Sequence, residues 1–319
     1  MKTLQISAPG SDPRWSDEPI PRPLDHQVQI KIDATALNYA DLLMIEGRYQ
    51  ETPPFPLVPG MEIAGVITAR GSGVTSHAVG DRVAALIGHG GLAEFAVIDA
   101  DRALGLPTAI NTATAAAFQI TYATAHLALA RRARLKKGET LVVLGAAGGA
   151  GFAAVEIGHA LGAKVIAVAR GSDRLEVARR AGADHALDSS DPAFSENLVA
   201  LAPFDAVYDA VGGVDGTAAA RHLRPEGRHV LIGFASGDLP VLKPNHLLVK
   251  NIDVIGFNIS AYAKFNPSAL SDSLRTLLDW HGAGRIQPHI GHTFPLGEAV
   301  QALDLLKSRK ATGKIVITQ

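Results

Sequence analysis

The sequence predicts an α/β protein in which a doubly wound parallel sheet is joined to a smaller β-rich domain. Residues 1–100 have the pattern of short strands separated by turns. From about residue 113, an Ala-rich helical stretch leads into a regular alternation of strand and helix patterns. Such alternation is typical of parallel sheets that carry helices on both faces. With 319 residues, the chain is long enough to form two domains.

Strand patterns of period two and turn dipeptides mark the β-rich part. Residues 28–32 alternate between apolar and polar side chains, and residues 63–67 and 82–86 are also strand-like. The dipeptide Pro59-Gly60 marks a turn between them. We therefore expect a small domain of short strands in this part of the chain.

Six strand patterns separated by helical patterns make up the doubly wound part. They cover residues 141–144, 164–169, 185–187, 205–208, 229–232 and 252–255. A long amphipathic helix is expected over 267–281 and a last strand over 314–317. We expect the C-terminal segment to return to the first domain. The predicted domains are therefore a β-rich one formed by 1–119 and 262–319, and a doubly wound one formed by 120–261.

The composition excludes several classes of function. Thirty basic residues balance 31 acidic ones, and a net charge of −1 offers no general attraction to nucleic acid or to membranes. The chain has no cysteine, which excludes disulfides, Cys-ligated zinc and thiol nucleophiles. The first residues lack an apolar signal segment, and the longest apolar run, 140–155, contains four glycines. We expect a cytoplasmic enzyme.

The most informative segment is the glycine-rich turn that follows the first strand of the doubly wound part. An apolar strand over 141–144 leads into this turn, a helical pattern follows over 152–161, and the next strand covers 164–169. A βαβ unit of this kind binds a dinucleotide pyrophosphate through backbone N–H groups at the helix N-terminus. Ala146 stands where the motif has its first glycine, and a turn without any ligand is the alternative. The expected contacts are Ala147, Gly148, Gly149, Ala150 and Gly151.

The end of the next strand indicates which dinucleotide binds. NAD sites place a carboxylate about twenty residues beyond the glycines, where it accepts from the ribose 2′-hydroxyl. This chain instead has Arg170, Ser172 and Arg174, whose donors suit a 2′-phosphate. We interpret Asp173 as an N-cap or first-turn acid of the following helix. The sequence thus favours NADPH over NADH, with a solvated helix start as the alternative.

The order and spacing of these motifs resemble the medium-chain dehydrogenase/reductase superfamily, and within it the zinc-independent, zeta-crystallin-like NADPH:quinone oxidoreductases. The resemblance covers nearly the whole chain and implies a GroES-like catalytic domain and a Rossmann domain. The segments that carry it are 36–41 (ALNYAD), 47–49 (GRY), 58–65 (VPGMEIAG), 146–151 (AAGGAG), 208–213 (YDAVGG), 233–237 (GFASG) and 310–314 (KATGK).

The departures from the zinc alcohol dehydrogenases bear on the mechanism. Where those relatives carry a zinc-ligand cysteine, this chain has Asn38, and where they carry Gly-His-Glu it has Gly60-Met61-Glu62. Their cysteine-rich structural-zinc lobe is missing. Without a Lewis acid, alkoxide chemistry loses its main driving force. We therefore expect metal-free hydride transfer to substrates that are already electrophilic, namely quinones or α,β-unsaturated carbonyls.

The resemblance implies two catalytic residues in the β-rich domain. The Asn38 amide would donate to the substrate carbonyl or orient the nicotinamide, and an Asx-turn or helix cap is its alternative role. The Tyr49 hydroxyl would line the substrate pocket and donate to a developing oxyanion, with a half-buried structural tyrosine as the alternative. We interpret Asp41 as a cap of the following helix and Glu62 as a carboxylate paired within the fold.

Further cofactor contacts are expected in the doubly wound domain and near the C-terminus. Ligands of parallel sheets bind at the carboxyl ends of the strands. The resemblance adds Thr124, the better candidate of the pair Thr121 and Thr124, near the nicotinamide, and Lys310 near the adenosine phosphate. At the ends of two neighbouring strands lie the remaining candidates, which are Asp209, Val211, Gly212, Gly233, Phe234 and Ser236.

The segment 250–257 is predicted to be the outermost strand of the sheet, and by resemblance two subunits would join there as a homodimer. We expect an NADPH-dependent reductase of quinones or enones. The alternatives are a 2-enoyl-thioester (CoA) reductase of the same superfamily and a non-catalytic NADPH-binding protein.

Overall fold

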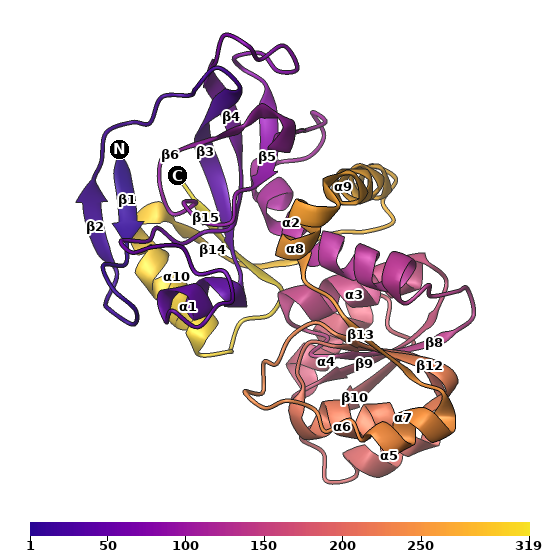
Figure 1. Cartoon of the computed structure of the whole chain (residues 1–319). Coiled ribbons are helices and arrows are strands. Elements are labelled where there is room, and N and C mark those ends of the chain that lie inside the picture. Colours follow the sequence, from indigo (N-terminus) through magenta and orange to yellow (C-terminus); the bar gives the residue numbers. More distant parts are fainter. The chain divides into compact units, whose positions relative to one another are not determined.

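The computed structural model describes all 319 residues of the chain. It divides into two compact units: Met1–Ile120 with Ile290–Gln319 form the first, and Thr121–His289 form the second (Figure 1). This division differs from the expected domains at Ile120, which belongs to the first unit, and in the segment 262–289, which belongs to the second. Hydrogen bonds from this segment to the rest of the unit account for the difference. They join Ser273 Oγ to His126 Nδ1 (2.8 Å) and Arg285 to the carbonyl of Ala160 (2.7 Å).

The first unit contains a seven-stranded sheet in the order β14-β15-β3-β4-β5-β7, with β6 paired to β3. The period-two pattern predicted at 28–32 buries Val28, Ile30 and Ile32 in one hydrophobic cluster. The strands are β1 (Lys2–Gln5) and β2 (Arg14–Asp17), which pair apart from this sheet, then β3 (Gln27–Leu37), β4 (Glu62–Arg70), β5 (Arg82–Leu86), β6 (Phe95–Asp99), β7 (Leu104–Gly105), β14 (Ile290–Pro295) and β15 (Lys314–Thr318).

Two short helices pack near the end of this sheet. Helix α1 (Tyr39–Ile45) directly follows β3, and α10 (Ala299–Lys307) precedes β15. Leu42 of α1 and Leu303 of α10 belong to one buried cluster with residues of β3 and β15. The 3₁₀ turns are η1 (Ala100–Arg102) and η3 (Leu296–Glu298). Helix α2 (Thr112–His126) begins in this unit, ends in the second and continues as the π-helical segment η2 (Leu127–Arg132).

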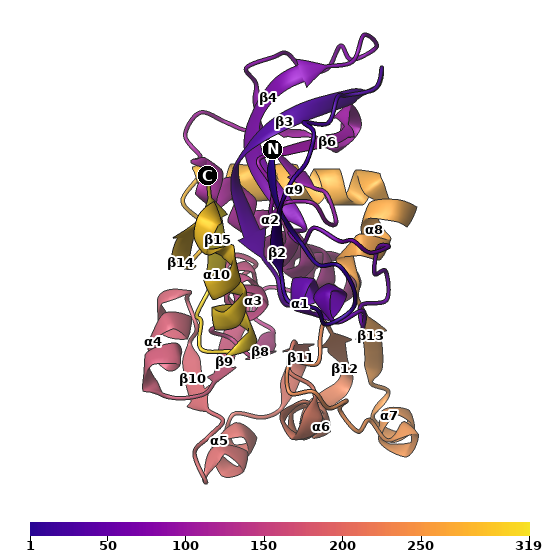
Figure 2. The ribbon, with the colours of Figure 1, turned by 90° about the vertical axis from the view of Figure 1, so that its left-hand side faces the viewer.

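The second unit confirms the predicted doubly wound parallel sheet. Figure 2 shows its six strands from left to right in the order β10-β9-β8-β11-β12-β13. The strand order reverses between β8 and β11, and sheets of this kind bind ligands at such a switch point, beside the carboxyl ends of the two strands. The strands are β8 (Thr140–Leu144), β9 (Lys164–Ala169), β10 (His185–Asp188), β11 (Phe204–Asp209), β12 (Leu223–Leu231) and β13 (Asp253–Gly256).

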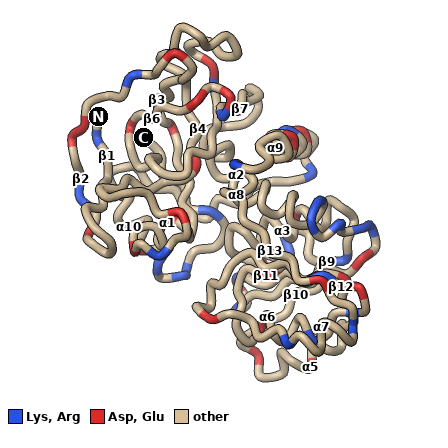
Figure 3. Tube along the Cα trace, viewed as in Figure 1, with Lys and Arg blue, Asp and Glu red and all other residues tan.

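Helices cover both faces of this sheet: α3 lies on one face, and α5 and α6 on the other (Figure 1). The helices are α3 (Gly149–Ala160), α4 (Ser172–Arg180), α5 (Phe194–Ala200), α6 (Gly213–Arg221), α7 (Pro244–Lys250), α8 (Ile259–Phe265) and α9 (Pro267–Gly282). Strand β13 is the outermost strand, as predicted for 250–257. None of the helices has the length and apolarity needed to cross a membrane. Figure 3 shows basic and acidic residues interspersed along the chain.

Candidate active site and nucleotide-binding edge

The glycine-rich turn lies at the switch point of the second unit. Strand β8 ends at Leu144, Gly145 adopts a positive φ of 73°, and α3 begins at Gly149 with Gly148 as its N-cap. The helix thus starts three residues before the apolar pattern at 152. A Cβ on Gly151 would lie 2.1 Å from the Gly145 carbonyl oxygen. Only glycine therefore lets the helix approach the strand end this closely.

This turn fits a pyrophosphate group. Gly149, Ala150 and Gly151 form the first turn of α3, where backbone N–H groups have no acceptor within the helix. Gly148 is exposed, and Gly149 and Ala150 are partly buried. Ala147 precedes them and is buried. The N-terminus of a twelve-residue helix thus presents N–H groups and favourable partial charge to an anion.

The end of β9 presents the side chains expected at a 2′-phosphate. Arg170 and Ser172 are exposed and Arg174 is partly buried, all at the start of α4. Asp173 lies in the first turn of α4, as predicted. Sequence analysis missed Asp188 at the end of β10, whose carboxylate accepts from the Gly171 N–H (3.0 Å). The signal available was an acid at the end of the neighbouring strand.

Two carboxylates influence the surroundings of Arg170. The hydroxyl and backbone N–H of Ser190 and the N–H of Gly171 lower the pKa of Asp188, and Arg170 adds to this effect. Burial raises the pKa of Asp215, which the charge of Arg170 partly offsets. The negative charges of these two carboxylates therefore offset part of the positive charge that Arg170 offers to a bound anion.

The loops after β11 and β12 bring the remaining candidates of this unit to the same edge of the sheet. Gly233 is partly buried, Phe234 is 41% exposed, and the exposed Ser236 donates to the carbonyl of Val211 (2.7 Å). Asp209 was expected to contact the cofactor, but its side chain is wholly buried and both of its oxygens have partners in the protein. It can therefore influence a bound ligand only by fixing the loop whose N–H groups it accepts from.

The candidates on α2 and near the C-terminus have different environments. Thr121 and Thr124 are both buried on α2. Lys310 is exposed in the loop between α10 and β15 of the first unit. Its neighbour Arg309 lies over the Tyr39 ring, 5.7 Å from the ring centroid. Lys310 thus presents its ammonium group to solvent, as an anion-binding side chain requires.

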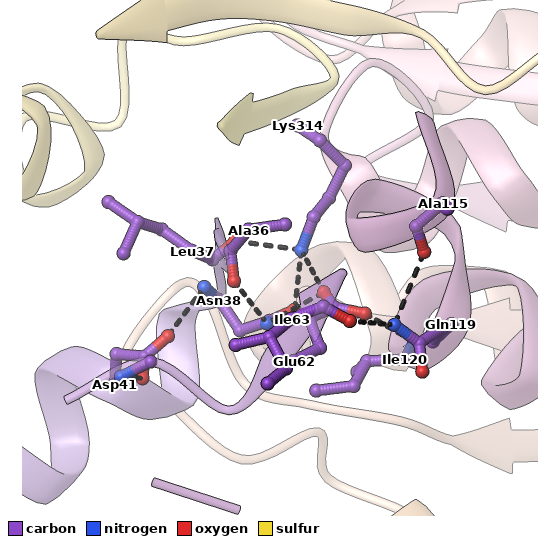
Figure 4. Close-up of polar contacts among 11 residues, drawn as sticks. Ala36, Leu37, Asn38, Asp41, Glu62, Ile63, Ala115, Gln119, Ile120 and Lys314 are labelled. Carbon is purple, nitrogen blue, oxygen red and sulfur yellow. Dashed lines mark hydrogen bonds and ion pairs between the residues drawn. The ribbon is translucent and has the colours of Figure 1, made fainter. Parts of the chain in front are cut away.

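A buried polar cluster lies at one end of the large sheet of the first unit, where β3 ends and β4 and β15 begin (Figure 4). The Lys314 ammonium donates to Glu62 Oε1 (2.8 Å), to Asn38 Oδ1 (2.7 Å) and to the Leu37 carbonyl (2.7 Å). Glu62 Oε2 accepts from the Ile120 N–H (2.8 Å). Glu62 is 0% and Lys314 4% exposed, so the ion pair is fully desolvated. The expectation that Glu62 is paired within the fold is confirmed.

This cluster occupies both ends of the Asn38 side chain. Its Oδ1 accepts from Lys314, while its Nδ2 donates to Glu62 Oε1 (3.0 Å) and to the Ala36 carbonyl (3.3 Å). An amide nitrogen has two hydrogens, and both are used here. The expected donation from Asn38 to a substrate oxygen would therefore require one of these bonds to break. The geometry instead gives Asn38 the role of N-cap residue of α1.

Asp41 caps α1 in the way that the sequence predicted. Its Oδ2 accepts from the Asn38 N–H (2.7 Å), and its Oδ1 accepts from the Gly60 N–H (2.8 Å). Burial raises the pKa of Asp41 to about 6, although these two N–H groups and Lys314 favour the ionised form. The carboxylate therefore joins the start of α1 to the turn before β4.

Tyr49 lies on the apolar side of this region. It is partly buried and packs against a cluster formed by Ile6, Met44, Leu57 and Met61. Its backbone carbonyl accepts from Thr52 Oγ1 (2.8 Å). Tyr49 is therefore held both by packing and by a local turn, as a half-buried tyrosine with one polar end.

The residues of the cluster do not fit a zinc site. Zinc in proteins takes Cys, His and carboxylate ligands, whereas the candidate positions hold an amide at Asn38 and a thioether at Met61. The carboxylate of Glu62 is already neutralised by the Lys314 ammonium 2.8 Å away. A dication placed beside that ammonium would be repelled by it.

Comparisons with known proteins agree with this architecture. An alcohol dehydrogenase GroES-like domain model matches residues 24–108, and a zinc-binding dehydrogenase model matches residues 181–317. The chain is 36% identical over 307 residues to quinone oxidoreductase-like protein 2 of Bos taurus, covering 95% of this chain and 88% of the relative. The chain belongs to the quinone oxidoreductase family of the medium-chain dehydrogenases/reductases.

Solved structures of this family superimpose on the whole chain. The quinone oxidoreductase of Thermus thermophilus, which was also solved in complex with NADPH, has 31% identity and a TM-score of 0.89, with both chains covered completely. The Escherichia coli quinone oxidoreductase complexed with NADPH has 25% identity and a TM-score of 0.93, again with complete coverage. The CurK enoyl reductase has 26% identity and a TM-score of 0.89, covering 99% of this chain and 98% of that one. The protein is therefore an oxidoreductase of this superfamily, with a GroES-like and a Rossmann-type domain.

Proposed function

We propose that the protein is an NADPH-dependent reductase of quinones or α,β-unsaturated carbonyls that works without a metal ion. The observation that carries the proposal is the glycine-lined N-terminus of α3 at the switch point, with Arg170, Ser172 and Arg174 at the end of the next strand. NADPH complexes of the relatives from Thermus thermophilus and Escherichia coli support the choice of nucleotide. The Lys314 ammonium on Glu62 and Asn38 supports chemistry without zinc.

When bound, NADPH supplies a hydride to an electrophilic carbon of the substrate. The N–H groups of Gly149, Ala150 and Gly151 would bind its pyrophosphate. Arg170 and Arg174 would hold the 2′-phosphate through charge-assisted hydrogen bonds. Removing a substrate from water and orienting it can supply much of the rate with such electrophiles, so a strong acid is not required.

Tyr49 is the proposed catalytic hydrogen-bond donor of the first unit. Tyr49 packs against the apolar cluster that contains Met44 and Met61, and such an apolar surface suits a quinone or enone. The hydroxyl can donate to the oxygen on which negative charge develops. Asn38 would act here as a positioning residue, because its amide is bonded within the cluster.

Reduction of a 2-enoyl thioester is the second candidate function. The likeness to the CurK enoyl reductase favours it, as does 32% identity over 297 residues to a mycobacterial phthioceranic/hydroxyphthioceranic acid synthase, of which this chain spans only 14%. The exposed Lys310, beside Arg309, could contact a CoA phosphate. The two candidates share the hydride chemistry, and they differ in the carbonyl group conjugated to the reduced double bond, which is a thioester in one and a ketone or quinone in the other.

We further propose a homodimer that pairs two copies of β13. This edge strand has unpaired backbone groups and the exposed Val254, and the exposed Leu248 and Val249 precede it in α7. Two edges related by a two-fold axis would pair isologously. Sedimentation at micromolar protein concentration tests this: a dimer is expected, and a 33.3 kDa species alone would reject it.

The test of the function uses EDTA-dialysed protein with its zinc content measured. We expect NADPH oxidation with a quinone or an α,β-unsaturated ketone at zinc contents far below one per chain. Faster turnover of a 2-enoyl-CoA than of either would favour the second candidate. Activity that appears only after zinc is added would reject metal-free chemistry. NADPH binding without turnover on all three substrate classes would instead indicate a non-catalytic binding protein.

The choice of nucleotide is tested by binding measurements that follow nicotinamide fluorescence. We expect NADPH to bind at least about ten-fold more tightly than NADH, and Arg170→Glu to remove that preference. Arg179→Glu is the matched control, because Arg179 is an exposed arginine of α4, the helix that follows Arg170, and is paired with Glu176. Equal loss in both variants would mean that general charge, not a 2′-phosphate site, sets the affinity.

A further inference from the structure

A buried histidine–aspartate pair lies beneath the loops at the carboxyl edge of the second unit's sheet. Asp209 is the last residue of β11 and His229 lies in β12, and both are 0% exposed. His229 Nε2 is 2.9 Å from Asp209 Oδ2. In the parallel register His229 stands opposite Val207, so its side chain lies on the same face of the sheet as that of Asp209.

The second oxygen of Asp209 holds the turn that follows β11. Its Oδ1 accepts from the N–H groups of Val211 (3.0 Å) and Gly212 (2.7 Å). Gly212 has a positive φ of 73°, which side-chain-bearing residues rarely adopt. One carboxylate thus links β12 to a turn whose backbone would otherwise carry unpaired donors.

The loop after β12 is in turn fastened to this turn. Ser236 donates to the Val211 carbonyl from its backbone N–H (2.9 Å) and from its hydroxyl (2.7 Å). The Gly213 N–H donates to the Asp238 carbonyl (2.9 Å). Both loops that carry the proposed nucleotide contacts are therefore fixed by the same set of hydrogen bonds.

Helix α6 also packs against the carboxylate of Asp209. A Cβ on Gly216 of α6 would lie 2.2 Å from Asp209 Oδ2, so the helix already touches the carboxylate. The carboxylate has backbone donors on one oxygen and the imidazole on the other. Movement of the imidazole would therefore be transmitted to the turn at 211–212.

The unpartnered nitrogen of His229 indicates its tautomer. Nδ1 is buried and has no hydrogen-bond partner, whereas Nε2 faces a carboxylate that can only accept. A hydrogen on Nδ1 would be a buried donor without an acceptor, which is costly. The ring therefore carries its hydrogen on Nε2, and only this end of the ring makes a polar contact.

We propose that His229 is a positioning residue for nucleotide binding, which acts by holding Asp209 and thereby the turn at residues 210–212. Neither side chain contacts the ligand, since both are wholly buried. Asp209 instead affects the site indirectly, because it fixes the backbone of the turn at residues 210–212. This inference rests on the proposed NADPH site, and it assigns a role to a residue that carries no sequence motif.

The test compares two amide substitutions of the histidine. In His229→Gln the amide nitrogen can reach the place of Nε2 and donate to Asp209. In His229→Asn it reaches only the place of Nδ1, where the structure has no partner. We expect His229→Gln to keep the NADPH dissociation constant within about three-fold of wild type, and His229→Asn to weaken binding at least about ten-fold.

Two controls, one on β11 and one on β12, separate positioning from stability. Tyr208→Phe removes a buried hydroxyl that has no partner and should leave NADPH binding unchanged. Leu223→Ala opens a cavity in the core cluster at the first residue of β12, away from the carboxyl edge, and should lower the melting temperature without weakening NADPH binding at low temperature. Binding that weakens as much in Leu223→Ala as in His229→Asn would show a merely structural effect and overturn the proposal.

A measurement on the wild-type protein without nucleotide keeps the proposal testable if a variant does not fold. Nitrogen-15 NMR of the histidines should show His229 with its hydrogen on Nε2, and a hydrogen on Nδ1 would overturn the argument. If wild type does not bind NADPH at all, the proposed function fails. If wild type binds and both amide variants bind equally well, only this inference fails.

Discussion

Removal of the Lys314 ammonium is the sharpest test of the buried cluster in the first unit. In Lys314→Met the chain keeps a side chain of similar length, but the Leu37 carbonyl, Asn38 Oδ1 and Glu62 Oε1 lose their donor. The Glu62 carboxylate then stays buried with only two neutral donors, Asn38 Nδ2 and the Ile120 N–H. The variant therefore contains an uncompensated charge in the interior.

The expected cost follows from the burial of both partners. With Glu62 at 0% and Lys314 at 4% exposure, solvent does not screen the pair. Removing one partner of such a pair typically costs about 3–5 kcal/mol of the free energy of unfolding. We expect Lys314→Met to fall in this range. The double variant Lys314→Met/Glu62→Gln should recover about 1–3 kcal/mol, because it removes the unpaired charge.

Urea denaturation measures these differences if each unit is followed separately. The two tryptophans serve this purpose, since Trp15 lies in the first unit and Trp280 in the second. Fluorine NMR of fluorotryptophan-labelled protein should show an earlier transition at Trp15. Lys307→Met, which removes an exposed lysine of α10, is the control and should change stability by less than about 0.5 kcal/mol. A double variant less stable than Lys314→Met would refute the reasoning.

Three further predictions concern pH, the glycine turn and catalysis. Burial raises the pKa of Glu156 from 4.5 to about 7, although the Tyr122 hydroxyl donates to it. Because the folded protein then holds a proton that the unfolded chain has lost, stability should fall by about 3 kcal/mol as pH rises from about 4.5 to 7, and Glu156→Gln should reduce this slope in denaturation midpoints. Gly151→Ala should destabilise the second unit and abolish NADPH binding, whereas Gly148→Ala, whose Cβ meets its nearest atom at 3.5 Å, should weaken binding while keeping the melting temperature. Tyr49→Phe should lower kcat about ten-fold or more with NADPH affinity unchanged, as steady-state kinetics and fluorescence titration would show.

Each of these expectations has a contrary result. A pH slope that is the same in wild type and Glu156→Gln would assign the dependence to other groups, such as Asp41. Equal melting temperatures of Gly151→Ala and wild type would contradict the close approach at Gly145. An unchanged kcat in Tyr49→Phe would mean that solvent, and not Tyr49, supplies the proton and the hydrogen bond to the substrate oxygen.

Much of the fold follows from short-range patterns in the sequence. The strand expected at 164–169 has these bounds in the structure, and the helix expected at 267–281 ends one residue later, at Gly282. Helix α3 starts earlier than its apolar pattern because Gly149, Ala150 and Gly151 fit a first turn without contributing to that pattern. Boundaries depend on caps, whereas element types depend on periodicity.

The placement of 262–289 depended on contacts that no local pattern shows. The amphipathic face of α9 predicted burial, but not which unit would bury it. Ser273 is hydrogen-bonded to His126, and Arg285 donates to the carbonyl of Ala160; each pair is more than a hundred residues apart in the sequence. Long-range partners of this kind are invisible in a pattern that repeats every few residues.

The sequence alone determined the class of fold, the glycine turn at the switch point and the absence of cysteine ligands, because periodicity, steric freedom and side-chain chemistry are properties of each residue and its neighbours. Only the tertiary structure decided what the polar candidates do. The Asn38 amide is bonded to Glu62 and to Lys314, which lies 276 residues further along the chain, and Asp209 is held by a histidine of the next strand. Whether a buried polar group can meet a ligand depends on which of its hydrogen bonds are already made, and strands and loops brought together by the fold make them.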